Sequence, residues 1–161
     1  MNTHVLFGIS VAMSFVAFGL VTKIYILPGL RALPRQEALL ALVIPHTFRF
    51  IGLSFLVPGV VAPTLPPAFA VPVAYGDLVA AALATAAVLA IITKWSWALG
   101  VVWAFNLWGT ADLLHAIYQG QIGVGIDPSE LGAAFFIPTV IVPPLLVTHG
   151  LIFLFLPRTK M

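Results

Sequence analysis

Hydrophobic residues along this chain form five long runs, which prolines, glycines and charged residues separate. The runs occupy residues 5–27, 39–61, 73–92, 97–118 and 133–156. Each run is close to the roughly 20 residues that a transmembrane α-helix needs to cross a bilayer. We therefore predict an all-α integral membrane protein, a bundle of five transmembrane helices.

The composition supports this class. Of the 161 residues, 61% are hydrophobic and only 7% are charged, whereas a soluble domain has about 25% charged residues. The length is that of one domain, so we expect residues 1–161 to form a single five-helix domain in the lipid bilayer. The absence of cysteine excludes disulfides and thiolate metal sites. A net charge of +2 is too small to indicate nucleic-acid binding.

The basic residues predict the orientation of the bundle. If there are five spans, every Lys and Arg except Arg49 falls on one side of the membrane: Lys23, Arg31, Arg35, Lys94, Arg158 and Lys160. Lys and Arg are enriched in short cytoplasmic loops. We therefore expect the N-terminus outside and the C-terminus in the cytoplasm, in the inner (cytoplasmic) membrane of a bacterium.

Arg49 lies near the middle of the second run. Charged side chains at membrane depth are rare, face a bundle interior or a water-filled cavity, and indicate a functional site. A guanidinium there needs a partner, and either Asp77 or Asp112 is within its reach. We expect Arg49 to pair with one of these carboxylates at the wall of a cavity. His46 lies on the same face because residues three apart are neighbours on a helix.

Other polar residues lie at comparable depth in neighbouring runs. A rise of 1.5 Å per residue puts His46 and His149 at the same level, roughly 10 Å from the cytoplasmic side. Asn106 in the fourth run is about as deep as Arg49. The prolines of segment 136–144 will bend the fifth helix and free carbonyl groups toward the same interior, to which Thr139 in this segment would also contribute.

Asp112 and His115 form a second candidate pair in the fourth run. They are three residues apart, so the carboxylate can hold the imidazole and raise its pKa relative to an isolated ring. This pair would lie near the outer opening of the site.

These residues predict a polar intramembrane cavity that binds or transports a small ligand, either anionic or lipophilic. Arg49 would attract a carboxylate or phosphate group. Because five helices cannot divide into two matching repeats, transport by repeats would require a homo-oligomer. The candidate ligand-binding residues are Arg49, His46, Asn106, Asp112, His115, Asp77, His149 and Thr139.

Two other classes of function stay open. An intramembrane isomerase, cyclase or hydrolase would act on a lipophilic substrate by proton transfer, with Asp112, His115 or His46 as catalytic candidates. A structural or assembly subunit would use the same polar network only to hold the helices together, and it would have no cavity.

Metal and haem binding are weighed separately. His46 and His149 at equal depth could ligate a haem from opposite sides, but no run has paired histidines at four-residue spacing. Asp77, Asp112 and His115 would form a metal site only with suitable geometry. We assign no metal ligand, and we disfavour haem without naming another cofactor.

Overall fold

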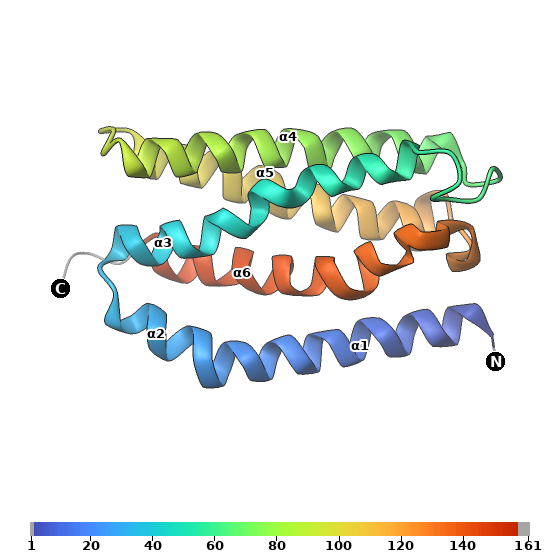
Figure 1. Cartoon of the computed structure of the whole chain (residues 1–161), viewed down its shortest axis with the longest axis horizontal. Helices are drawn as coiled ribbons and strands as arrows, with labels where there is room; N and C mark the ends of the chain where they lie inside the picture. The colour runs from blue at the N-terminus through green and yellow to red at the C-terminus, as the bar shows by residue number, and fades with distance from the viewer. Residues whose placement is uncertain (1, 158–161) are drawn as a thin grey trace.

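The computed structural model describes residues 2–157, and this part of the chain is helical throughout, without a β-strand (Figure 1). Its helices form five rods that run alongside one another. The first rod consists of α1 (Thr3–Val21), η1 (Thr22–Ile26) and α2 (Leu27–Ala32), and the second of α3 (Arg35–Val43) and η2 (Ile44–Leu56). The third is α4 (Pro67–Ile92), and the fourth is α5 (Ala98–Tyr118) with η3 (Gln119–Gly123). The fifth consists of η4 (Pro128–Phe135), η5 (Ile137–Ile141) and α6 (Val142–Phe155).

Four segments among the described residues are long and apolar enough to cross a membrane: Thr3–Ala32, Arg35–Leu56, Pro67–Ile92 and Ile137–Phe155. The prediction of an all-helical protein is confirmed, and these four helices indicate a membrane-integral protein. The fourth rod is not among them. Its helix α5 has 21 residues, but it contains Asn106, Asp112 and His115, which lower its hydropathy.

The second rod changes from an α-helix to a 3₁₀-helix at Ile44, immediately before Pro45. A 3₁₀-helix has three residues per turn, so residues three apart lie in line along one side. At 13 residues η2 is much longer than most 3₁₀-helices. Its spacing of three matches the buried positions of η2, which are His46, Arg49, Gly52 and Phe55. The 3₁₀ geometry therefore keeps both polar side chains pointing into the bundle.

The third rod packs closely against its neighbours through small residues. α4 contacts η2 and α5 most extensively. Alanines let helix backbones approach one another, and four alanines of α4 are buried: Ala80, Ala81, Ala84 and Ala87. This close approach brings the polar side chains of three rods within bonding distance.

The interior has two apolar clusters, one toward each end of the bundle. One cluster includes Leu39, Phe105 and Ile152, and the other includes Phe55 and Leu131. Five of the buried polar side chains are located between these clusters along the rods: His46, Arg49, Asp77, Asn106 and His149. We call these five residues the polar layer.

The first rod lies at the edge of the bundle. None of the residues of α1 is buried, and α1 packs mainly against α6, η5 and η4 (Figure 1). Because α1 buries none of its residues, space remains between it and the other rods.

The basic loops gather at one end. The connection between α2 and α3 and the turn between α4 and α5 lie at the same end of the bundle (Figure 1). There the Arg35 guanidinium donates a hydrogen bond to the Leu156 carbonyl. Arg158 and Lys160 lie outside the described residues.

Candidate functional site

Arg49 joins three rods through its guanidinium. Nε donates to Oδ1 of Asp77 at 2.8 Å, and Nη2 donates to Oδ2 of Asp112 at 2.6 Å. Nη2 also lies 2.7 Å from Oδ1 of Asp77, and Nη1 donates to the Gly109 carbonyl at 3.1 Å. The predicted pairing of Arg49 with a carboxylate is confirmed. Asp77 and Asp112 both contact the guanidinium, although the sequence analysis expected only one of them to do so. Every guanidinium nitrogen therefore has a partner.

Two glycines make room for this cluster. A Cβ atom at Gly52 would overlap the carboxylate of Asp77, and one at Gly76 would overlap the carboxylate of Asp112. Any larger residue would push a carboxylate away from Arg49. The glycines thus set how closely η2 approaches α4 and how closely α4 approaches α5.

Two buried histidines extend the polar layer toward the other apolar cluster. Nδ1 of His149 lies 2.6 Å from Oδ1 of Asn106, whose Nδ2 donates to the His149 carbonyl at 3.3 Å. Nε2 of His46 lies 2.9 Å from Oγ1 of Thr148. The two imidazole ring centroids are 4.2 Å apart, so the prediction that His46 and His149 lie at one level is confirmed.

The imidazoles adjoin the arginine at Gly109. A Cβ atom there would lie 2.8 Å from Nε2 of His149 and 2.9 Å from Nη1 of Arg49. Nε2 of His149 and Nδ1 of His46 are buried without a hydrogen-bond partner. The polar layer is thus continuous from Asp77 to His46.

The positions of these side chains bear on metal and haem binding. His46 and His149 contact each other directly, which leaves no space for a porphyrin between their rings. The carboxylates of Asp77 and Asp112 are bound by Arg49. Residues 2–157 contain no group of three or more His, Cys, Asp or Glu side chains that could hold a metal ion.

Asp112 and His115 are not joined in the way that their spacing suggests. The Asp112 carboxylate turns toward Arg49 because the guanidinium is the stronger partner. Nε2 of His115 instead lies 3.2 Å from Nε2 of Gln119. No ion pair links Asp112 to His115 in the part of the chain that the structure describes. Both residues border a shallow hollow of about 220 Å³ beside Trp108.

Thr139 is buried, but it does not join the polar layer. Its hydroxyl donates to the Phe135 carbonyl at 2.7 Å. This bond satisfies a carbonyl four residues earlier, close to the proline-containing η5 segment. The structure therefore gives Thr139 a local role within the fifth rod.

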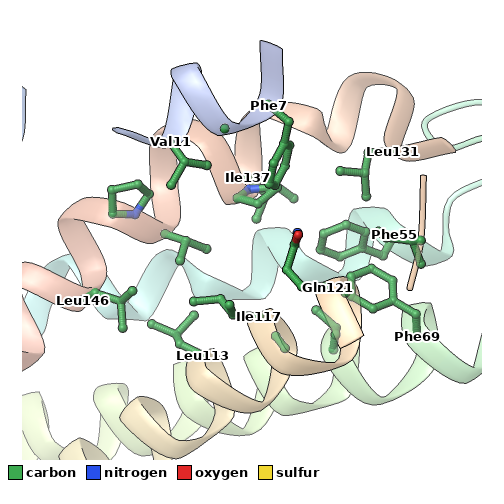
Figure 2. Close-up of a pocket in the computed structure, with 18 of the residues that line it drawn as sticks. Phe7, Val11, Phe55, Phe69, Leu113, Ile117, Gln121, Leu131, Ile137 and Leu146 are labelled. Atoms are coloured by element: carbon green, nitrogen blue, oxygen red, sulfur yellow. The ribbon is translucent and has the colours of Figure 1, made fainter. Parts of the chain in front are cut away.

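A cavity of about 470 Å³ lies between α1 and the other rods. Figure 2 shows Phe7 and Val11 of α1 on one side of it and Leu113 and Ile117 of α5 on the other. Apolar side chains form most of its wall. The polar or charged side chains that line it are His4, Asp77 and Gln121.

The cavity differs from the polar one that the sequence predicts. Arg49 is not among its lining residues, so the expectation that Arg49 lies at the cavity wall is wrong. Its partner Asp77 reaches the wall instead. Sequence reasoning also missed the contribution of α1, because apolar residues such as Phe7 and Val11 have the same pattern whether they face lipid or a cavity.

An exposed ion pair lies beside the cavity, at the N-terminal end of α1. Nε2 of His4 is 3.8 Å from Oδ2 of Asp127. The backbone N–H and the hydroxyl of Ser129 both donate to the Asp127 carboxylate. These bonds, with a smaller contribution from His4, hold the pKa of Asp127 below its usual value. The pair connects α1 to the start of η4.

Comparison with known proteins identifies the family. A family model described as "Domain of unknown function (DUF8737)" matches residues 6–157, and the chain belongs to this family. No curated protein and no solved structure matches the chain. The family match includes the polar layer and nearly all of the cavity wall.

Replacing Arg49 with leucine should strongly destabilise the fold. The change leaves two carboxylates close together in an apolar interior, and removing one partner from a buried ion pair costs about 3–5 kcal/mol. Thermal unfolding of the purified protein in detergent measures the effect. Adding Asp77→Asn and Asp112→Asn to Arg49→Leu should recover much of the lost stability, and no recovery would show that the unpaired carboxylates are not the cause of the loss.

Two glycine-to-alanine changes should have opposite effects. Gly150 lies in α6, and a Cβ atom added there would meet nothing within 4 Å, so Gly150→Ala should stabilise its helix by about 0.5–1 kcal/mol. Gly76→Ala should lower the unfolding temperature because the new methyl group displaces the Asp112 carboxylate from Arg49. Equal shifts for both variants would show that the close approach at Gly76 is unimportant.

Proposed function

We propose that this member of the family binds a small lipophilic molecule within the membrane, in the cavity between α1 and the other rods. The observation that supports this most directly is the cavity itself, about 470 Å³ in volume and mostly apolar. Ligand sites in proteins are typically about 300–1,000 Å³, mainly apolar, with a few placed polar groups. Binding of this kind is the step that a receptor and a transporter share.

The contacts of Arg49 favour a lipophilic ligand over an anionic one. All three guanidinium nitrogens already donate to protein oxygens. An anion would have to displace Asp77 or Asp112, and it would have to approach past the Asp77 carboxylate, which lines the cavity. The wall is suited to apolar groups, with Asp77 and Gln121 as its polar contacts.

The same observations argue against the two alternative classes. A structural subunit needs no cavity, whereas this protein has a cavity with the volume of a ligand site. The three residues that the sequence offers for acid-base catalysis are not free at the cavity. Asp112 is bound to Arg49, and His46 and His115 are absent from the residues that line the cavity.

We also propose five membrane crossings, with the N-terminus outside and the C-terminus in the cytoplasm of a bacterium, in its inner membrane. The polar side chains of α5 that face inward, Asn106 and Asp112, are bonded within the bundle, so α5 can lie in lipid despite its lower hydropathy. Arg31 and Arg35 flank the connection between α2 and α3, and Lys94 lies in the turn between α4 and α5, at the same end of the bundle (Figure 1). The homo-oligomer stays a prediction.

Filling the cavity should weaken ligand binding. Ala12 lines it, whereas Ala17 is exposed on the same helix and does not. Ala12→Trp should lower the affinity for the neutral fluorophore N-phenyl-1-naphthylamine at least about tenfold, which corresponds to about 1.4 kcal/mol. Fluorescence titration of the protein in lipid nanodiscs measures this.

The matched variant Ala17→Trp should bind like the parent. Two outcomes count against the proposal: equal loss of affinity in both variants, or no saturable binding of the fluorophore to the parent protein.

Cysteine labelling tests the orientation. The natural chain has no cysteine, so Thr64→Cys and Lys94→Cys each introduce one reactive thiol in a loop. A membrane-impermeant maleimide should label Thr64→Cys in intact cells, and it should label Lys94→Cys only after permeabilisation. Labelling of both variants from the same side would exclude the proposed topology.

A further inference from the structure

The charges around Asp77 are unbalanced. Arg49 contributes one positive charge, and Asp77 and Asp112, which share its guanidinium, contribute two negative charges when ionised. Uncompensated charge in an apolar membrane interior is costly. One additional positive charge beside a carboxylate would therefore balance the charges of this cluster.

Asp77 is the carboxylate that faces the cavity. Both contacts with Arg49 use its Oδ1 atom. Among the described residues no hydrogen bond reaches its Oδ2 atom, although the residue is only 6% exposed. An acceptor oxygen thus remains free on the acidic side chain that lines the cavity.

None of the other charged or titratable groups described near Asp77 bonds to its Oδ2 atom. Arg49 approaches it from η2 and is fully bonded, and Asp112 of α5 adds negative charge. His4 of α1 also lines the cavity but has Asp127 as its ion-pair partner. The histidines of the polar layer adjoin Arg49 on its Gly109 side.

Aromatic rings in the cavity wall provide a second, independent attraction for cations. Phe7, Phe15, Phe55 and Phe69 all line it, and Phe55 packs edge-on against Phe69 with ring centroids 5.8 Å apart. The face of an aromatic ring attracts an ammonium group, more strongly when water is excluded. An apolar and aromatic wall with one carboxylate matches an ammonium group attached to a hydrophobic body.

We propose that the ligand of this cavity is a lipophilic amine in its protonated form, whose ammonium group donates a hydrogen bond to Oδ2 of Asp77. This inference rests on the proposed function, since it names the chemical class of the ligand at that site. A charge-assisted hydrogen bond is roughly twice as strong as a neutral one, and the cation balances the excess negative charge. A neutral molecule of the same shape binds through its apolar body alone.

Three probes with the same aromatic body test the proposal: 1-naphthylmethylamine, 1-naphthylmethanol and 1-naphthoic acid. They differ mainly in charge, and each is measured by displacement of N-phenyl-1-naphthylamine from the parent protein at neutral pH, in nanodiscs of zwitterionic phosphatidylcholine, which has no net charge. The amine should bind at least about tenfold more tightly than the alcohol, and the acid should bind most weakly. Equal affinity of the amine and the alcohol would overturn the proposal.

Asp77→Asn should remove the preference for the amine, so that the amine and the alcohol bind this variant with equal affinity to within about twofold. Glu37→Gln removes one acidic charge at an exposed position of α3, outside the residues that line the cavity, and should keep the preference. A preference that persists in Asp77→Asn would overturn the assignment to Asp77. The comparison of probes on the parent protein does not depend on the folding of either variant.

The two proposals fail in different ways. If the amine and the alcohol bind equally and Ala12→Trp weakens both, the cavity binds lipophilic molecules and only the cationic preference is wrong. If no probe displaces the fluorophore and Ala12→Trp has no effect, the proposed function itself is wrong.

Discussion

One guanidinium shared by two carboxylates in an apolar interior is the interaction on which the rest of this structure depends. Buried charges must be paired, because their desolvation is costly. The pairing of Arg49 with Asp77 and Asp112 fixes η2, α4 and α5 at a separation that only glycine tolerates, at Gly52 and Gly76. The unusual 3₁₀ geometry of η2 also favours this pairing, because it aligns Arg49 with the other inward-facing residues of η2.

The polar layer also separates two regions with different packing. On one side, Leu39, Phe105 and Ile152 form a closely packed apolar cluster. On the other side, the wall formed by Phe55, Phe69 and their neighbours opens into the cavity. Asp77 belongs to both the polar layer and the cavity wall, since it bonds to Arg49 and also lines the cavity. The charge that organises the bundle is thereby adjacent to the space that a ligand would fill.

The first rod closes this space without being buried in the bundle. α1 has no buried residue and packs mainly against the fifth rod. Little packing energy would be lost if α1 moved, because hydrophobic stabilisation scales with the apolar area removed from contact with solvent. A peripheral helix over an apolar cavity fits a protein that receives its ligand from the bilayer.

The sequence by itself determined the helical class, the approximate rods, the need of Arg49 for a carboxylate and the equal depth of His46 and His149. Bilayer thickness, helical rise and the energy of buried charge act on local sequence, so these features can be derived from spacing alone. The charged residues at membrane depth also suggested a polar cavity with Arg49 at its wall, whereas the cavity beside α1 is mostly apolar and Arg49 is not among its lining residues.

Only the tertiary structure decided which side chains meet. It gave Arg49 two carboxylates, directed Asp112 away from His115, and confined Thr139 to a local bond. It also located the cavity beside α1. An apolar side chain that faces a cavity has the same sequence pattern as one that faces lipid, because a cavity arises from incomplete packing between helices that are far apart in the chain.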